Sequence, residues 1–288
     1  MSSIELQNIN YVYSAGTPFE KAALTDVSVI FNGGVITGLI GHTGSGKSTL
    51  VQLMNGLMKP TSGTVLLDGK DIWAEPKKIR DVRFRVGLCF QYPEYQLFEE
   101  TVYKDIAFGP KNMKLSDEEI DRRVREAARF IGVTDDMLEK SPFDLSGGEK
   151  RRVAIAGVMA MEPKILILDE PTAGLDPRGR DTILGLIRNY REETGRTVMI
   201  VSHSMDDVAE IATKVLVINN ARVAMYGTVP EIYARSEELV SMGLDIPQVT
   251  KIFLGLKENG IPVRTDVYTV EQARAQLREL REKGVLAW

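Results

Sequence analysis

The stretch "ITGLIGHTGSGKSTL", residues 36–50, decides the fold of this chain. Its first five residues suit a strand that is buried on both faces, and a glycine-rich loop and a helical pattern follow directly. Gly41 and Gly46 allow backbone N–H groups to wrap around phosphates, Lys47 can reach the terminal phosphates, and the Ser48 hydroxyl can ligate Mg²⁺. A glycine turn that arises by chance rarely has this strand–loop–helix context. The stretch therefore predicts a nucleotide site in an α/β fold.

Further along the chain, short apolar runs alternate with helical segments. Residues 164–169, 197–202 and 214–218 have the composition of strands buried on both faces, and helical patterns separate them. Such alternation is typical of a mostly parallel sheet with crossover helices. Residues 4–13 and 25–31 instead alternate between apolar and polar side chains, so we expect them in an antiparallel β layer. The predicted fold is an α/β phosphate-loop NTPase core.

Two helical regions complete the predicted organisation. Residues from about 92 to 160 are mostly helical in pattern, and we expect a helical subdomain inserted between two core strands, within a domain that covers residues 1–230. Ser116 and Glu119 predict a capping box at one of its helices. Residues 231–288 lack strand signals and predict a small helical appendage for packing or dimerisation. Its helices show an apolar face at Val249, Ile252, Phe253 and Leu256, and a capping box at Thr269 and Gln272.

Composition excludes several classes of protein. The 288 residues carry a net charge of -4, which offers no global attraction to nucleic acid. No run of roughly 20 apolar residues is present, and the first residues do not resemble a secretion signal. A single cysteine, Cys89, excludes an internal disulfide and is expected to be a small core residue. We expect a cytoplasmic protein whose attachment to a membrane depends on a partner.

Two adjacent acids complement the glycine loop. In "KILILDEPTAGLD", residues 164–176, Asp169 ends an apolar strand and can help to hold magnesium, while Glu170 can orient or deprotonate an attacking water. His203 ends the strand 197–202, and Gln91 follows another apolar run. Either side chain could be an ordinary polar surface residue, but the glycine loop favours a role near the nucleotide for His203. The basic cluster 77–85 is most simply a solvated face.

A second element that suits phosphate binding lies about a hundred residues after the glycine loop. In "LSGGE", residues 145–149, a hydroxyl and two glycines precede an apolar helical run. A helix start offers unpaired N–H groups and the positive end of the helix dipole, which suits an anion.

These motifs together resemble the ATPase subunit of an ABC transporter. The likeness covers about residues 4 to 230 and implies that Gln91 is the Q-loop glutamine, Asp176 lies in the D-loop, and His203 senses the γ-phosphate. Tyr13 is similar to the aromatic residue that stacks on adenine, with Tyr11 as the alternative. The ATP-binding residues implied are Tyr13, Gly41, His42, Thr43, Gly44, Ser45, Gly46, Lys47, Ser48 and Thr49, and the Mg²⁺ ligands are Ser48, Gln91 and Asp169.

Two longer stretches narrow the resemblance. Residues 90–112 and 151–177 are similar to the energy-coupling factor (ECF) ATPases, which drive uptake of vitamins and transition metals. Residues 16–24 and 41–49 look more like the second of the two paralogous ATPases in that complex. The family implies a head-to-tail dimer, with itself or with a paralogue. In that dimer the signature residues Leu145, Ser146, Gly147, Gly148 and Glu149 contact the ATP of the other subunit. Glu149 departs from the glutamine that usually ends this signature.

The resemblance also implies membrane partners. They are an integral coupling subunit and a separate substrate-binding subunit, so the chain would lie peripherally at the cytoplasmic face of the membrane. We expect docking through an exposed apolar cluster made by Tyr92, Tyr95, Leu97 and Phe98.

Three alternative functions also bind a nucleotide at a glycine loop of this kind. A conventional ABC importer or exporter would differ in its partner and not in its chemistry. A soluble ABC protein acting on ribosomes or DNA usually has two motif sets or long inserted arms, and this chain has neither. A phosphate-loop kinase would leave residues 145–149 and His203 without a purpose.

Overall fold

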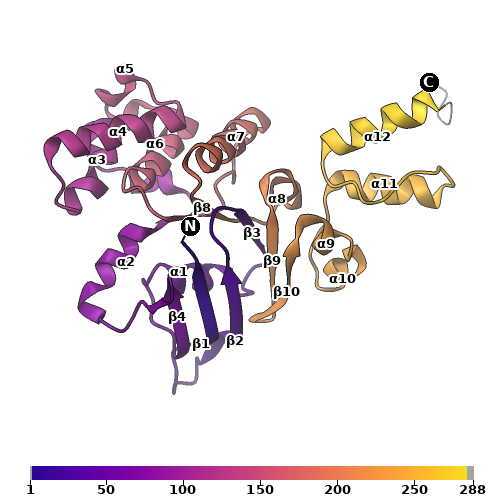
Figure 1. Ribbon diagram of the computed structural model, residues 1–288, viewed down its shortest axis with the longest axis horizontal. Coiled ribbons are helices and arrows are strands. Elements are labelled where there is room, and N and C mark those ends of the chain that lie inside the picture. The colour runs from indigo at the N-terminus through magenta and orange to yellow at the C-terminus, as the bar shows by residue number, and fades with distance from the viewer. Residues whose placement is uncertain (1, 284–288) are drawn as a thin grey trace.

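The computed structural model describes residues 2–283, which fold around two β-sheets (Figure 1). The larger sheet has six strands in the order β10-β9-β3-β8-β7-β6. The neighbours from β9 to β6 are parallel, and β10 pairs with β9 antiparallel. The strands are β3 (Ile36–Ile40), β6 (Val86–Cys89), β7 (Ile165–Asp169), β8 (Thr197–Val201), β9 (Lys214–Asn219) and β10 (Arg222–Thr228).

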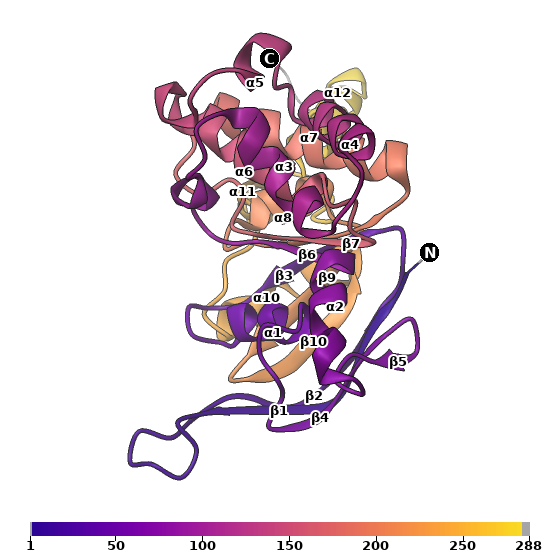
Figure 2. The same cartoon turned by 90° about the vertical axis from the view of Figure 1, so that its left-hand side faces the viewer.

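Helices and a second sheet cover the two faces of the six-stranded sheet, which explains the continuous apolar composition of its strands. On one face lie helix α1 (Lys47–Met54) and an antiparallel sheet in the order β2-β1-β4-β5. On the other face lie the inserted helices together with α7 (Pro177–Thr194) and α8 (Met205–Ile211), as Figure 2 shows. The predicted strand layers are thus confirmed. The antiparallel strands are β1 (Ile4–Tyr13), β2 (Lys21–Phe31), β4 (Ser62–Leu67) and β5 (Lys70–Asp71).

The inserted helical subdomain lies between β6 and β7 in the chain. It contains α3 (Val102–Asn112), α4 (Asp117–Ile131), α5 (Asp135–Leu138) and α6 (Gly147–Met159). The predicted capping box at the start of α4 is only half formed. Ser116 accepts the N–H of Glu119, but the Glu119 carboxylate instead bonds the guanidinium groups of Arg122 and Arg123, and those stronger charged bonds keep it from the helix start.

The C-terminal region packs in two parts. Helices α9 (Val229–Tyr233) and α10 (Ser236–Ser241) belong to the main body, because Tyr233 and Leu239 are members of its core. Helices α11 (Gln248–Glu258) and α12 (Val270–Glu282) enclose a small core of their own around Phe253. The packing boundary therefore lies near Pro247, after the expected position at residue 230. Ile252, expected on the apolar face of α11, is 58% exposed.

The basic cluster 77–85 is only partly a solvated face. Lys77, Lys78 and Arg80 are exposed, but Arg83 and Arg85 in helix α2 (Ile79–Arg85) are half-buried, and Arg83 donates to the Gly56 carbonyl oxygen at 3.1 Å. Over residues 2–283, none of the helices has the length and apolar composition needed to cross a bilayer.

Candidate nucleotide site

The predicted catalytic groups lie at one edge of the larger sheet. The glycine loop follows β3, His203 follows β8, and Gln91 follows β6. Asp169 is the last residue of β7, and Glu170 comes directly after it. These four strands are neighbours and run parallel, so their carboxyl ends meet at the same edge. In open α/β sheets this edge is where ligands bind.

The glycine loop has a backbone that excludes other residue types. Gly46 has a φ of 112°, and an added Cβ would overlap the carbonyl oxygen of Ala23. A Cβ at Gly41 would overlap the carbonyl oxygen of Ile218. The Lys47 ammonium donates to the carbonyl oxygens of Gly41 and His42, at 2.6 and 3.0 Å, so the loop curls around its own lysine. Burial lowers the Lys47 pKa, and the nearby Glu170 and Asp169 carboxylates oppose that effect.

An aromatic side chain lies beside this loop. Tyr13 is 41% exposed, and its hydroxyl lies 3.0 Å from the Thr49 Oγ1. Tyr11 meets the Tyr13 ring edge-on, with ring centroids 4.9 Å apart, but it packs against the core. The open hollow next to the loop, about 190 Å³, is lined by Tyr13, Lys21, Ala23, Gly44, Gly46, Lys47, Ser48 and Thr49. Of the two tyrosines, Tyr13 is the one with a ring available to a base.

The carboxyl group of Asp169 has an unusual pKa. Burial and, to a lesser extent, the Glu170 carboxylate raise the pKa to about 6, although Lys47 and a hydrogen bond with Ser48 act in the opposite direction. A cation at this point would relieve the repulsion between the two acids. One carboxylate, one hydroxyl and ligand phosphates form the kind of oxygen set in which Mg²⁺ is usually held. Ser48 and Asp169 therefore fit a Mg²⁺ ion that arrives with a nucleotide.

Glu170 and His203 form a pair. The His203 Nδ1 lies 2.8 Å from the Glu170 Oε2, across neighbouring strand ends. Glu170 is 8% exposed and has a φ of 52°, and its N–H donates to the Val201 carbonyl oxygen at 2.9 Å. A left-handed conformation costs a non-glycine residue about 1–3 kcal/mol and is typical of functional positions. The arrangement can orient a water molecule beside a bound phosphate.

Residues 145–149 start helix α6 with a complete capping box. The Glu149 Oε2 accepts the N–H and the hydroxyl of Ser146, at 2.8 and 2.6 Å, and the Ser146 Oγ accepts the Glu149 N–H at 3.4 Å. Leu145 is buried, whereas Ser146 and Gly147 are exposed. None of the residues that line the hollow at the glycine loop belongs to this stretch. The three-residue spacing of Ser146 and Glu149 is the sequence signal for this capping box, and sequence reasoning missed it.

Asp176 and Asp207 organise the segments behind the two acids. Asp176 caps α7 by accepting the Gly179 N–H at 2.7 Å. Asp207 is 2% exposed and accepts from Ser204 at 2.7 Å, from the Arg180 Nε at 2.6 Å and from the hydroxyl of Thr172. It thereby joins the segment after Glu170 to the segment after His203. Asp207 lies in an ordinary polar run, and sequence reasoning missed it.

Arg151 joins three further segments. It is 3% exposed in α6 and pairs with the Glu94 carboxylate through two bonds, of 2.6 and 3.0 Å. Its NH1 group also donates to the carbonyl oxygens of Pro171, at 3.4 Å, and Ala173. The signature helix, the turn after Gln91 and the segment after Glu170 are therefore linked through one guanidinium. In the sequence, Arg151 and Glu94 look like ordinary solvated side chains, so this pair could not be predicted.

Comparisons with known proteins identify the family. Residues 24–173, more than half of the chain, match a family model described as ABC transporter. The chain belongs to the ABC transporter family. A curated relative from Clostridium acetobutylicum, energy-coupling factor transporter ATP-binding protein EcfA2, is 51% identical over 98% of this chain and 99% of its own length. A relative of the same name from Listeria monocytogenes is 46% identical over 98% of this chain and 99% of its own length.

Solved structures of ABC transporter proteins agree with this assignment. The structure of cbiO1 from Clostridium perfringens, described as part of the ABC transporter complex cbiONQ, is 42% identical and covers 83% of this chain and 93% of its own, with a TM-score of 0.74. A dimeric bacterial ABC transporter cassette, MJ0796, is 28% identical and covers 78% of this chain and 98% of its own, with a TM-score of 0.70. The predicted fold, the ATPase class and the likeness to the second ECF paralogue are confirmed.

The apolar cluster expected for docking of this ABC ATPase is divided between two surfaces. Tyr95 is 84% exposed, and Tyr92 packs beside Arg151, whose guanidinium lies 5.7 Å from the ring centroid. Leu97 and Phe98 instead line a groove of about 430 Å³ beside α3 and α6. The remaining lining residues of this groove are Arg80, Arg83, Phe84, Gln96, Asp105, Phe108, Gly109, Asn112, Val153, Ala154, Gly157, Val158 and Met161.

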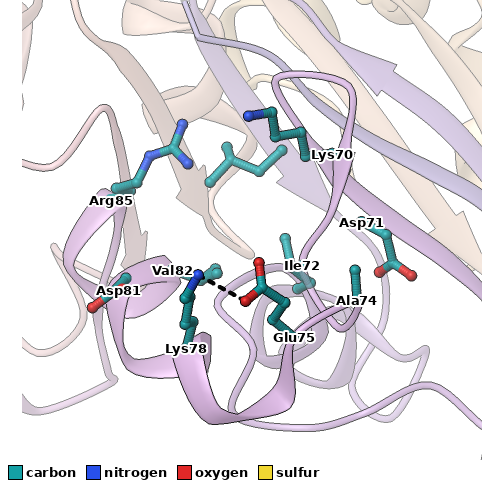
Figure 3. Close-up of a pocket in the computed structure, with 10 residues that line it drawn as sticks. Lys70, Asp71, Ile72, Ala74, Glu75, Lys78, Asp81, Val82 and Arg85 are labelled. Carbon is teal, nitrogen blue, oxygen red and sulfur yellow. Dashed lines mark ion pairs between the residues drawn. The ribbon is translucent and has the colours of Figure 1, made fainter.

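Another hollow of the ABC ATPase, about 500 Å³, lies between the β4–β5 hairpin and α2, away from the sheet edge (Figure 3). Its lining mixes basic and acidic groups, and Lys78 pairs with Glu75 at 2.7 Å. A nucleotide triphosphate requires a concentration of donors and positive charge, which this mixed lining does not supply. The charged lining residues are Lys70, Asp71, Glu75, Lys78, Asp81 and Arg85.

Proposed function

We propose that this chain is the ATP-binding and hydrolysing subunit of an ECF importer, and that it drives uptake of a vitamin or a transition-metal ion through membrane partners. The observation that carries the proposal is the gathering of the glycine loop, two acids, a histidine and a glutamine at the ends of four neighbouring parallel strands. Relatives named as ECF transporter ATP-binding proteins, up to about half identical over nearly the whole chain, support the transport context.

ATP binds at the glycine loop. The adenine base stacks on Tyr13, the phosphates accept from the N–H groups of residues 41–49, and Lys47 leaves its carbonyl partners for the terminal phosphates. Mg²⁺, bound with ATP, neutralises phosphate charge, and Ser48, Asp169 and Gln91 would hold it.

Glu170 positions the attacking water and accepts its proton. Its carboxylate lies next to the metal-binding carboxylate Asp169 and within hydrogen-bond reach of His203. In this scheme His203 orients the Glu170 carboxylate in one direction and contacts the γ-phosphate in the other. Gln91 changes its contacts when the nucleotide changes, and this movement is passed to the turn that follows it, residues 92–98.

Two subunits pair head to tail. A dimeric structure of the similar cassette MJ0796 supports the pairing of two such subunits. The start of α6 is exposed and lies outside the hollow at the chain's own glycine loop, so its Gly147 and Gly148 N–H groups serve the ATP of the other subunit. The second subunit is a paralogue or another copy of this chain. Asp176 lies in the D-loop, which faces the other subunit in this dimer.

The groove beside α3 and α6 receives a helix of the membrane coupling subunit. Phe98 and Phe108 are 58% and 46% exposed, and their rings meet edge-on with centroids 5.1 Å apart. Exposed apolar rings in a groove of this size suit an amphipathic helix. A separate membrane subunit binds the solute, and the ATPase lies peripherally at the cytoplasmic face. A conventional ABC importer is the second candidate, and the partner recovered at this groove distinguishes the two.

The shared nucleotide site is tested by complementation. One chain carries Lys47→Ala, the other Ser146→Arg, and each is inactive alone. A mixed head-to-tail dimer has one site with both changes and one with neither, so we expect up to about half of the normal ATPase activity per dimer to return. If the native partner is a paralogue, one change goes into each of the two subunits at the corresponding positions.

The control is a dimer in which both changes are in the same chain, paired with an unchanged partner. It should have two damaged sites, one through each change, and remain inactive. Failure of the first mixture to recover activity, in dimers confirmed by affinity tags on both chains, would contradict the head-to-tail site.

A further inference from the structure

The carboxylate of Glu149 engages both donors of Ser146 at the start of α6. The Ser146 hydroxyl donates to Glu149 Oε2 at 2.6 Å, and the Ser146 N–H donates to the same oxygen at 2.8 Å. A serine hydroxyl has one hydrogen, and a phosphate oxygen can only accept. The Ser146 hydroxyl therefore cannot donate to an incoming phosphate until it leaves Glu149.

Two other complete capping boxes among residues 2–283 show what a glutamate changes. At α9, Glu231 Oε2 accepts the Thr228 hydroxyl at 2.9 Å and the Thr228 N–H at 2.8 Å, as Glu149 does. At α12, the Gln272 Oε1 accepts the N–H groups of Thr269 and Tyr268, at 3.2 and 2.7 Å, and takes no hydrogen from the Thr269 hydroxyl. In these three complete boxes, both glutamates accept the hydroxyl of the cap, and the one glutamine leaves it free.

Glu149 also places a negative charge at a helix start that favours anions. Its hydrogen bonds from Ser146 hold the Glu149 pKa below its ordinary value, with smaller contributions from Arg152 and Lys140. The carboxylate is therefore ionised at neutral pH. It satisfies donors that the helix start would otherwise present to a phosphate, and it repels a second anion at the same place.

We propose that Glu149 is a built-in competitor of the γ-phosphate of the partner's ATP, and that it raises the ATP concentration at which the ATPase dimer closes. The inference rests on the proposed head-to-tail site. Gly147 and Gly148 still offer their N–H groups, so closure remains possible, but Ser146 must exchange a charged acceptor within its own chain for one across the interface. Glu149 is a positioning residue that sets the threshold for closure through Ser146.

The test compares Glu149→Gln with the unchanged protein in the native ATPase pair. All proteins carry Glu170→Gln, so that ATP persists, and closure against ATP concentration is measured by light scattering or by a fluorescence pair across the interface. We expect the half-saturating ATP concentration to fall about tenfold, which corresponds to about 1.4 kcal/mol. In proteins that retain Glu170, Glu149→Gln should lower KM for ATP by a larger factor than it changes kcat.

Glu231→Gln is the matched control, because it makes the same chemical change in a capping box with no ligand. It should leave the ATP requirement unchanged, and both variants should have similar melting temperatures. In a Ser146→Ala background, Glu149→Gln should produce a clearly smaller shift. An equal shift there, or none in the unchanged background, would overturn the competition for Ser146.

Ser146→Arg separates this inference from the proposed function. If Ser146→Arg abolishes closure and Glu149→Gln has no effect, the shared site stands and the inference fails. If closure proceeds normally with Ser146→Arg, residues 145–149 do not meet the partner's ATP, and the proposed function itself fails.

Discussion

At the scale of single residues, the nucleotide site keeps charges that are unfavourable without a ligand. Asp169 and Glu170 are consecutive acids at a buried strand end, and burial together with the Glu170 carboxylate raises the Asp169 pKa to about 6. Glu170 also holds a left-handed backbone conformation, with a φ of 52°. Such costs are typical of sites where stability is given up for binding or catalysis.

Asp169→Asn should therefore stabilise the nucleotide-free chain while it weakens Mg²⁺-dependent ATP binding. A pKa raised from 3.8 to about 6 corresponds to roughly 3 kcal/mol for a wholly buried group, and for this partly buried one we expect about 1–2 kcal/mol at pH 8. The native state holds the proton more tightly than the unfolded state, so the penalty is absent below pH 3.8 and complete above about pH 6.

The measurement is urea unfolding of both proteins at pH 5 and pH 8, paired with nucleotide binding in the presence of Mg²⁺. The stability gain of the variant should be larger at pH 8. A gain that is the same at both pH values, or a loss at pH 8, would show that the Asp169 charge carries no such cost.

At the scale of elements, charged side chains tie the signature helix to its neighbours. The Arg151–Glu94 pair is nearly enclosed, and the guanidinium also bonds two carbonyl oxygens of the segment that follows Glu170. Replacing such a pair by apolar groups can be neutral, but removing one partner leaves a charge buried and unpaired. The pair therefore fixes how α6, the turn 92–98 and the segment after β7 lie relative to each other.

Arg151→Ala should lower the free energy of unfolding by about 3–5 kcal/mol, because Glu94 and two carbonyl oxygens lose their donor. Lys150→Ala, one residue earlier in the same helix, should change it by less than about 0.5 kcal/mol. Urea unfolding of the two variants measures the difference. Comparable values for both would mean that the Arg151–Glu94 pair contributes no more than a surface ion pair.

The strands and most helices could be predicted from the sequence because their apolar patterns follow periods set by the backbone. The glycine loop and the acids after β7 were also visible, since adjacent parallel strands bring their carboxyl ends together. Contacts such as Arg151 with Glu94 were not, because they depend on the packing of distant segments. For the same reason the capping role of Glu119 was wrong: two arginines one turn away compete for its carboxylate.

At the scale of the whole molecule, the groove beside α3 and α6 connects the nucleotide site to a proposed membrane partner. Phe98 forms part of its wall, and its N–H donates to the Asp105 carboxylate at 3.2 Å. The same segment begins at Gln91 and contains Glu94, which Arg151 holds. A movement at the site can therefore reach the groove through a few residues of chain.

Phe98→Ala with Phe108→Ala should weaken assembly with the membrane coupling subunit at least tenfold, because it removes the two exposed rings of the groove. ATP hydrolysis by the detached ATPase dimer should change less than twofold. Tyr95→Ala is the matched control, since it removes a ring that is 84% exposed and lies outside the groove lining. Recovery of the membrane subunit with tagged ATPase, together with turnover of the detached dimer, gives both readouts.

Intact assembly with the double variant would exclude this groove as the docking surface. Assembly lost equally with Tyr95→Ala would instead indicate that docking uses the exposed face of the turn 92–98, as the sequence had suggested.

The separate small core of α11 and α12 has a consequence for how this chain can change over time. Phe253, Val263 and Val267 pack with Ala273 and Leu280, and Tyr268 joins the unit to the body by contacting Tyr233 at 5.8 Å between ring centroids. Because this core is separate, we expect mutations inside it to leave the residues at the carboxyl ends of β3, β8, β7 and β6 in place. We therefore expect related subunits to differ in α11 and α12, provided that the contacts with the body are kept, which include Tyr268 with Tyr233 and the Gln248 N–H with Asp206.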